Sequence, residues 1–287
     1  MAPSANASEQ VDAVVQLGRG LPSDVHDRLF KSIGRSDLQQ ELLGFLDQVC
    51  GADSVHLFQL VDGRPDIACG LSLDGRAAHN QAEAYMERGL WRGDREMAES
   101  SRLERERPIL YRMDTTQAPT GDLRDFYRRQ KLIERLMVCG RTPIGVVGFS
   151  VMRSSPRGLT SADNQPGIDL AFSQVFPIVA KHMEMVGQSR RLVESLTTLP
   201  VIECYLELSG VRLPRREIQV AARLLYGLSA SCIASDLGIG TETVNTHRKR
   251  LYARLGIGCH HELLLWYLRH CSSAAMSMIA VPVIAAS

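Results

Sequence analysis

Two kinds of spacing between apolar positions divide the chain into two parts. From residue 54 to residue 152, short runs rich in apolar and β-branched residues predict strands. Before and between these runs, apolar positions three and four residues apart predict helices. The expected strands are 54–60, 63–70, 108–113, 135–140 and 144–152, and the expected helices are 38–49, 77–91, 95–107 and 122–132.

A long helical pattern follows the last predicted strand. It starts near Ser161, where Thr160 and Asp163 form a candidate capping pair. The apolar spacing continues for many turns, and Pro200 is expected to interrupt it because proline lacks the helical N–H donor. Residues 207–270 contain no strand-like run, and four shorter helices are predicted there.

This order of elements predicts an α+β domain followed by an all-α domain. Short strands joined by tight turns favour a central antiparallel sheet flanked by helices, as in sensor domains. The C-terminal part is expected to be a compact set of four helices. The boundaries we expect are a leader at 1–35, the α+β domain at 36–186, a linker at 187–206, the helical domain at 207–270 and an apolar tail at 271–287.

The composition is that of a globular protein without a strong overall charge. The 287 residues are 45% hydrophobic and 23% charged, and the formal net charge is +1. Nine basic and five acidic residues give 207–270 a charge of +4, so the rest of the chain carries −3. Any attraction to nucleic acid is therefore expected to be local and to come from the helical domain.

Several classes of protein are disfavoured by features that the sequence lacks. It has no secretory signal pattern, and no apolar run reaches the roughly 18 residues of a membrane span, so we expect no membrane partner. The seven cysteines form no Cys-x-x-Cys pair, which predicts reduced thiols in the cytoplasm, with no metal and no cofactor. No nucleotide-binding, serine-hydrolase or metalloprotease motif occurs, so we expect no enzymatic activity.

The second and third helices predicted in the C-terminal part are separated by only three residues, 238–240. Ser229 is expected to cap the helix before this turn. A helix, a short glycine-containing turn and another helix predict a helix-turn-helix motif. One face of the third helix is expected to pack inward, with its histidine as a core residue; it consists of Val244, His247, Leu251 and Leu255.

The opposite face of the third helix carries side chains that can read DNA bases. Asn245 can bond adenine bidentately, Lys249 can reach guanine, and the methyl group of Thr246 can touch thymine. The arginines beside this face suit phosphates. Charge alone would also fit a solvated helix, but the position directly after the turn favours a DNA groove. The candidate DNA-binding residues are Thr241, Glu242, Asn245, Thr246, Arg248, Lys249 and Arg250, with Arg254 also flanking the face.

Residues 213–267 resemble the LuxR-type (GerE) DNA-binding domain. That family reads approximately L-T-x-R-E-x-E-V, G-L-S-x-x-x-I-A and L-x-I-S-x-x-T-V-x-x-H-x-x-x-I-x-x-K-L-G. The corresponding segments here are LPRREIQV (213–220), GLSASCIA (227–234) and LGIGTETVNTHRKRLYARLGI (237–257). The resemblance covers about a fifth of the chain without a gap. It implies that Asn245, Thr246 and Lys249 face the groove and that the final helix, around 262–268, makes a dimer contact.

Four positions depart from the family pattern. Pro214 stands in place of the threonine that caps the first helix, and Gly240 in place of the serine before the recognition helix, so two capping oxygens are missing. Cys232 stands where the family often has glutamate. Asn245 stands where it commonly has lysine, which lowers the charge and should weaken nonspecific attachment to DNA.

The N-terminal part is less informative. The segment YMERGLWRGDREM (85–97) is similar to the Y-x-x-x-(aromatic)-x-x-D-P neighbourhood of acyl-homoserine-lactone-binding domains, except that Arg95 replaces the proline. A GAF- or PAS-like sensor domain fits equally well, and the aromatic residues also fit an ordinary core. If a pocket exists, a small amphipathic ligand is expected, with the aspartate accepting a ligand N–H. The candidate ligand-binding residues are Phe58, Tyr85, Trp91, Asp94 and Tyr111.

These patterns predict a sequence-specific DNA-binding transcriptional regulator. We expect a homodimer on double-stranded DNA, with an effector of unknown identity in the sensor domain and RNA polymerase as a further partner. The alternative is a ligand-binding and dimerisation module that acts as an anti-activator and binds no specific DNA. The sequence leaves open the operator, the effector and the choice between activation and repression.

Overall fold

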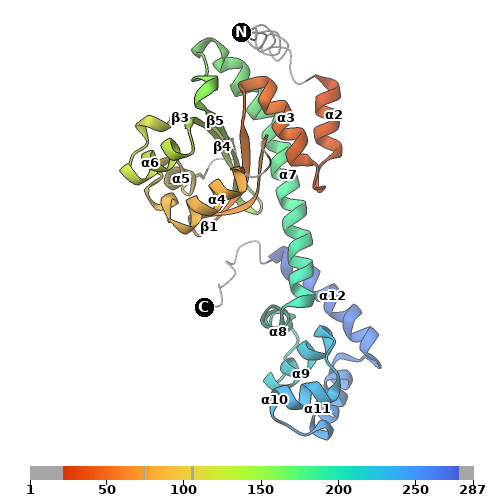
Figure 1. Cartoon of the computed structure of the whole chain (residues 1–287). Coiled ribbons are helices and arrows are strands. Elements are labelled where there is room, and N and C mark those ends of the chain that lie inside the picture. The colour runs from red at the N-terminus through yellow and green to blue at the C-terminus, as the bar shows by residue number, and fades with distance from the viewer. Residues whose placement is uncertain (1–21, 74, 76, 105–106, 278–287) are drawn as a thin grey trace. The chain divides into compact units, whose positions relative to one another are not determined.

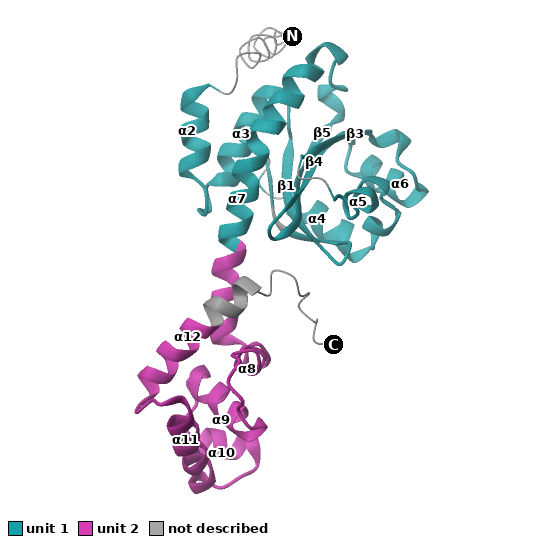
Figure 2. Cartoon of the chain, turned by 180° about the vertical axis from the view of Figure 1, so that it is seen from behind, with its two compact units in different colours: residues 1–186 teal, residues 187–287 magenta. Residues whose placement is uncertain are grey.

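A computed structural model describes residues 22–73, 75, 77–104 and 107–277 of the chain. It divides into two compact units, residues 1–186 and residues 187–287 (Figure 2). No helix among the described residues is both long enough and apolar enough to cross a membrane.

The first unit is built on a five-stranded antiparallel sheet, which confirms the predicted fold class. The strands are β1 (Ser54–Val61), β2 (Arg64–Ser72), β3 (Ile109–Asp114), β4 (Leu132–Thr142) and β5 (Gly145–Ser154), in the order β2-β1-β5-β4-β3. All five predicted strands are present. Asp62 and Gly63, both with positive φ, form the two-residue turn between β1 and β2, a conformation that these residue types favour.

Helices cover both faces of this sheet (Figure 1). They are α2 (Ser23–Lys31), α3 (Leu38–Cys50), α4 (Ala77–Glu87), α5 (Arg95–Ser100), α6 (Gly121–Arg129) and α7 (Gln165–Thr197). The helices α3 and α7 pack on one face and form with it the largest apolar core of the unit. Fully buried members of that core include Leu42, Leu46, Leu57, Leu136, Phe149, Val151 and Phe172.

Three predicted helices end earlier than the apolar spacing suggested, and the one expected over 122–132 ends at Arg129, with Leu132 already in β4. The helix expected over 77–91 ends at Glu87, because Gly89 takes a left-handed conformation (φ 63°) and the chain continues as the short 3-10 helix Leu90–Gly93. The helix expected over 95–107 ends at Ser100. The sequence of 101–107 is mostly charged, and of the residues described there Leu103 is the one buried in the apolar cluster under the sheet.

The predicted capping pair at the start of the long helix is wrong. Thr160 instead donates its hydroxyl proton to the buried carboxylate of Glu134 at 2.7 Å, and its backbone N–H donates to the same carboxylate at 2.9 Å. Arg112 and Arg153 also bind Glu134, so that carboxylate ties the segment after β5 to the sheet. The helix α7 consequently begins at Gln165, later than expected.

The long helix ends where Pro200 predicted an interruption. The helix α7 ends at Thr197, and α8 (Leu199–Glu207) begins with Pro200 in its first turn, a position that needs no N–H donor. The segment 187–206, expected as a linker, is thus helical except at Thr198. Of the expected leader, residues 22–35 contain α2; residues 1–21 and, in the expected tail, residues 278–287 lie outside the described residues.

The second unit consists, in its described part, of helices joined by short turns. It contains α8, α9 (Arg215–Tyr226), α10 (Ala230–Leu237), α11 (Thr241–Leu255) and α12 (His260–Ser277), as well as the end of α7. The apolar side chains of α9, Ile218 and Leu225 among them, are buried, as are Ile233 and Ala234 of α10. These side chains form one core with Ile202, Leu206, Val220, Ala221, Ala222, Val244, Leu251, Leu263 and Tyr267.

Candidate nucleic-acid interface and ligand cavity

Local interactions fix the turn that precedes α11. The hydroxyl of Ser229 accepts a hydrogen bond from the backbone N–H of Cys232 at 3.2 Å, so the predicted cap of α10 is confirmed. The helix ends at Gly238, whose φ of 63° lies in the left-handed region that glycine tolerates best. Gly240 has the extended conformation of an N-cap but offers no side chain to cap α11.

The inner face of α11 holds the helix against the rest of the unit. Val244 and Leu251 are fully buried and contact the core formed with α9 and α10, while Leu255 packs at its edge. His247, expected as a core residue, is only half-buried. Both the turn and this packing therefore determine which side of α11 faces outward.

Most candidate DNA-binding side chains lie on the outer side of α11. Thr241, Glu242, Thr246, Lys249 and Arg250 are exposed, and Asn245 and Arg248 are half-buried. The helix has 15 residues and is therefore about 22 Å long, with a diameter of about 10–12 Å, which matches the roughly 12 Å width of a DNA major groove. The hydroxyl of Thr246 donates to the carbonyl oxygen of Glu242 at 2.9 Å, which leaves its methyl group and oxygen lone pairs for other contacts.

The cations on this face differ in whether protein carboxylates neutralise them. Among the described residues, Arg248, Lys249 and Arg250 form no ion pair. Arg254, which the sequence placed beside them as a phosphate contact, instead binds the buried carboxylate of Glu217 on α9 at 3.1 Å. The free positive charge is thus concentrated in the three consecutive residues 248–250.

Residues 211–266 match the family model described as "Bacterial regulatory proteins, luxR family". The second unit carries a LuxR-family helix-turn-helix domain. The helices α9, α10 and α11 are the elements that the sequence resemblance predicted, and α10 and α11 form its helix-turn-helix. Within this LuxR-family domain, Pro214 occupies the N-cap of α9 without a side-chain hydrogen bond, as expected from the missing threonine.

Similar proteins of known description include one from Aeromonas salmonicida. That protein is named as a putative HTH-type transcriptional regulator in the exeN 3′ region, and it is 38% identical to this chain over 117 residues. The aligned part is 38% of this chain and 60% of that relative, so the chain spans only about three fifths of the relative's length.

The solved structures found by comparison share little sequence with this chain. The match to Escherichia coli SdiA covers 95% of this chain and 98% of SdiA, at 15% identity and a TM-score of 0.34. The match to a second structure, SdiA in complex with octanoyl-rac-glycerol, covers 97% of this chain and 98% of that one, at 15% identity and a TM-score of 0.36. The VqsR LBD domain from Pseudomonas aeruginosa covers 57% of this chain, with 96% of its own length, 11% identity and a TM-score of 0.42. These similarities are too distant to carry functional information.

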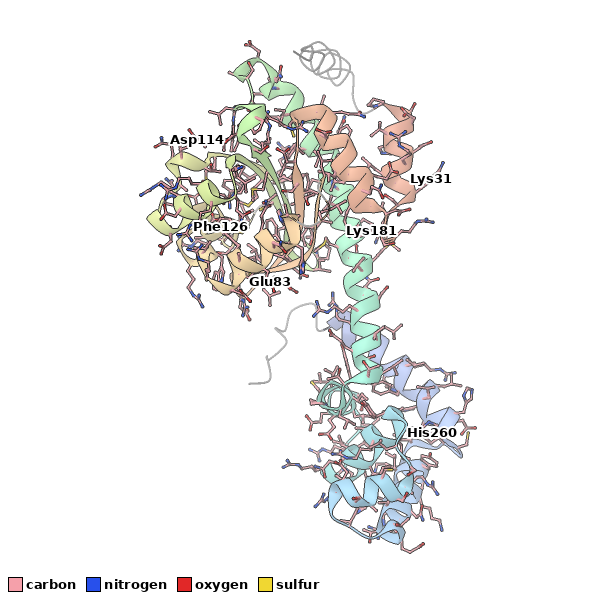
Figure 3. All side chains as sticks on the ribbon, in the orientation of Figure 1. Lys31, Glu83, Asp114, Phe126, Lys181 and His260 are labelled. Atoms are coloured by element: carbon pink, nitrogen blue, oxygen red, sulfur yellow. The ribbon has the colours of Figure 1, made fainter. Side chains whose placement is uncertain are left out.

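A small cavity lies in the first unit, between the sheet and the helices α4, α5 and α6. Its volume is about 30 Å³, which is room for about two water molecules. Phe126, labelled in Figure 3, contributes to the cavity from α6. The lining residues are His56, Phe58, Ile67, Gln81, Ala82, Tyr85, Met97, Phe126, Leu132, Arg135, Ser150 and Met152.

The structure brings two of the five candidate ligand-binding residues to this cavity. Phe58 and Tyr85 line it, whereas Trp91, Asp94 and Tyr111 do not. Trp91 is half-buried, with the guanidinium of Arg92 4.5 Å from the centre of its ring. Tyr111 packs half-buried in the neighbouring apolar cluster.

The carboxylate of Asp94 is fully occupied by groups of the protein. It forms a bidentate ion pair with the buried Arg135, accepts the hydroxyl proton of Tyr85 at 2.7 Å, and caps α5 by accepting the N–H of Met97 at 3.2 Å. Burial alone would raise the pKa of Asp94, but the charge of Arg135 and these hydrogen bonds outweigh it and lower the pKa to about 2. In this arrangement the carboxylate has no free lone pair for a ligand N–H.

The sequence signal for this network was incomplete. The spacing of Tyr85, Trp91 and Asp94 singled out the aspartate, but Arg135 appeared only as one residue of a predicted strand. A basic residue at an inward-facing position of an otherwise apolar strand was the signal that could have identified it. Among the described residues, no group of three or more His, Cys, Asp or Glu side chains could hold a metal ion.

The cap at Ser229 can be tested separately from any binding. Replacing Ser229 by alanine should lower the free energy of unfolding of the helical unit by about 1 kcal/mol, because an N–H at the start of α10 loses its acceptor. Urea unfolding followed by Trp266 fluorescence in a Trp91→Phe background would measure this. Ser235→Ala, at an exposed position in the middle of the same helix, is the control and should be neutral or slightly stabilising.

Proposed function

We propose that the chain is a sequence-specific, DNA-binding transcriptional regulator. The observation that carries this proposal is the outer face of α11, the second helix of the helix-turn-helix, which presents Asn245 and Thr246 beside the three consecutive unpaired cations 248–250. Unpaired cations alone would also fit a solvated helix, so the argument depends on their position directly after the turn, beside side chains that can read bases. The match of residues 211–266 to the luxR family model supports the same conclusion.

In this proposal α11 enters the major groove and divides its contacts between bases and phosphates. Asn245, Thr246 and Lys249 approach base edges, where amide, hydroxyl and ammonium groups can distinguish base pairs. Arg248 and Arg250 lie on the flanks and bind phosphates, which fixes the position of the helix along the duplex. Thr241 and Glu242, in the first turn, would lie at the end of the helix that enters the groove first.

We further propose that the regulator binds as a homodimer through α12. Leu263 and Tyr267 of this helix are buried in the unit's own core, whereas Leu265 is 40% exposed and can contact a second copy. Two copies related by a twofold axis would read two half-sites about one helical turn apart, so the operator would be a near-palindrome. Contact with RNA polymerase, and an effector bound in the first unit, complete the proposed mode of regulation.

The proposal can be tested with purified full-length protein and genomic DNA fragments. Selection of bound fragments followed by footprinting should yield a near-palindromic sequence that the protein protects at physiological salt. The alternative function, an anti-activator that only dimerises, predicts dimers in sedimentation experiments but no enriched sequence. That outcome would overturn the DNA-binding proposal.

The phosphate contacts lead to a separate prediction about salt. Arg248→Ala and Arg250→Ala should each weaken binding to all DNA sequences by a similar factor, because they remove charge and not base recognition. The slope of log K against log salt concentration should become shallower by about one unit per variant. Fluorescence anisotropy at several salt concentrations would measure this, with Arg95→Ala, at an exposed position of α5 in the other unit, as the control.

A further inference from the structure

The two faces of the sheet differ in chemistry although helices cover both. The face that packs on α3 and α7 is mostly apolar, with Val55, Leu57, Val138 and Val151 buried there, and its buried charges, Glu134 and Arg153, neutralise each other. The face towards α4, α5 and α6 carries a series of buried polar side chains. They are Ser54 and His56 on β1, Arg135 on β4 and Ser150 on β5. Burying polar groups is costly, so a row of them on one interior face needs an explanation.

His56 has one ring nitrogen with a partner and one without. It is 5% exposed, and its Nε2 lies 3.0 Å from the carbonyl oxygen of Ala78. Because a carbonyl oxygen only accepts, Nε2 must carry the proton. Burial lowers the pKa of His56, so the ring is neutral near pH 7 and Nδ1 is a bare acceptor. Nδ1 is buried and has no hydrogen-bond partner.

The packing of the ring shows towards which neighbour Nδ1 points. A Cβ added at Gly70 on β2 would lie 2.8 Å from Cδ2 of His56, so the Cδ2 edge of the ring faces β2. Nδ1 is on the opposite edge and is turned towards β5, where Ser150 is directly paired with His56. Ser150 is 3% exposed and lines the same cavity, and its hydroxyl has no hydrogen bond with the described residues.

We propose that His56 and Ser150 form a site for the hydroxyl group of an uncharged, otherwise apolar ligand. A hydroxyl can donate its proton to Nδ1 of His56 and at the same time accept the proton of Ser150. The apolar part of such a ligand would contact Phe58, Phe126 and Met152, which line the same cavity. This inference goes further than the proposed effector site in the first unit, on which it rests, and does not depend on DNA binding.

Other ligand groups match this pair less well. A carboxylate would place its lone pairs against the lone pair of Nδ1, and it would lose its hydration in a site this apolar. The nearby cation Arg135 cannot compensate, because Asp94 and Glu96 already neutralise it. A trans amide carries its N–H and its C=O on different atoms that point to opposite sides, so it cannot donate to Nδ1 and accept from Ser150 at one point as a hydroxyl oxygen can. An amide N–H directed instead at Asp94 would have to displace Tyr85 or Arg135 from that carboxylate. An ammonium group would pay a similar desolvation cost beside Arg135.

The size of the cavity limits what enters without a change in structure. About 30 Å³ accommodates a hydroxyl group and at most a few further atoms. A longer alcohol must therefore displace side chains of the covering helices, such as Tyr85 of α4 or Phe126 of α6. Their movement would be the first structural consequence of binding.

Two methionine methyl groups make the site observable by NMR. Met97 and Met152 line the cavity, whereas Met185 is 41% exposed on α7 and serves as an internal control. The full-length protein, labelled with ¹³C at the methionine methyls, would be titrated with 1-butanol, 1-hexanol, hexanoic acid and N-hexanoyl homoserine lactone. Saturable shifts of Met97 and Met152 with the alcohols, without shifts of Met185, are the expected result. The acid and the lactone should bind at least about tenfold more weakly, the equivalent of about 1.4 kcal/mol.

Variants separate a designed polar site from a cavity that accepts any apolar compound. Ser150→Ala removes the donor, and His56→Gln keeps an N–H near Ala78 while it removes the Nδ1 acceptor; each should weaken hexanol binding about tenfold. Ser54→Ala, which loses only the 3.3 Å bond to Gln81, should leave alcohol selectivity unchanged. ¹H–¹⁵N spectra would confirm that each variant is folded.

Two results would overturn the inference. One is the absence of any saturable shift with either alcohol, which would mean that the polar pair only binds water. The other is equal binding of alcohol, acid and lactone that neither Ser150→Ala nor His56→Gln changes. Because no DNA is present in these titrations, neither result bears on the proposed regulator function, and failure of DNA binding would not affect this one.

Discussion

Replacing Asp94 by asparagine is expected to destabilise the first unit by about 3–5 kcal/mol, which is the usual cost of removing one partner of a buried ion pair. Arg135 is 2% exposed and would keep its charge in the interior with only Glu96, at 3.3 Å and 18% exposed, as a carboxylate partner. Asparagine preserves the shape of the side chain and an oxygen that can cap α5. The effect would therefore isolate the charge from the cap.

Urea unfolding followed by the fluorescence of Trp91 would measure this effect. The experiment uses a Trp266→Phe background, because the chain has two tryptophans and Trp266 lies in the other unit. The double variant Asp94→Asn/Arg135→Met should recover most of the loss, since replacement of a whole buried pair is often neutral. Arg95→Ala, which removes an exposed pair with Glu99, is the control and should cost less than about 1 kcal/mol. A loss for Asp94→Asn no larger than this control would contradict a buried ion pair.

The same network determines how the first unit responds to acid. The pKa of Asp94 in the folded protein, about 2, lies below the 3.8 of an aspartate exposed to water. The unfolded state therefore binds the proton more tightly, and the stabilisation from Asp94 is fully present above pH 3.8 and is lost as the pH falls to 2. The wild-type stability should decrease over this interval, and that of the Asp94→Asn variant should change less.

Replacing Lys249 by alanine is expected to weaken binding to the selected operator by about 1–3 kcal/mol, or about tenfold to more than a hundredfold. The ammonium group is exposed on the outer face of α11 and has no carboxylate partner among the described residues. Its removal should therefore affect DNA binding and not the stability of the fold. The loss should be concentrated at one base pair of each half-site, where the variant should also discriminate less between bases.

Anisotropy titrations with the operator and with single-base-pair variants of it would measure both effects. Lys181→Ala is the matched control, since Lys181 is an exposed lysine of α7 in the first unit and binds Glu184; it should leave the operator affinity unchanged (Figure 3). Equal losses on the operator and on unrelated DNA would show that Lys249 contacts a phosphate and not a base. No loss on either would contradict the placement of α11 in the groove.

Much of the helical domain could be predicted from the sequence because its signals are local. Ser229 caps α10 by accepting an N–H from a residue only three positions later, and Gly238 ends that helix. Val244 and Leu251 repeat at helical spacing on the buried side of α11. Each of these features depends on residues less than two helical turns apart. His247 and Arg254 were less predictable, because their surroundings depend on where α9 lies.

The sequence by itself determined the order of strands and helices, the helix-turn-helix and the outward direction of Lys249, since these follow from periodicity and caps along one segment. Only the tertiary structure decided what surrounds Asp94, because its partner Arg135 lies 41 residues further along the chain. It also decided that His56 and Ser150 meet across adjacent strands at a cavity. Contacts of this kind depend on strand register and on the helices that cover the sheet, and no short stretch of sequence encodes either.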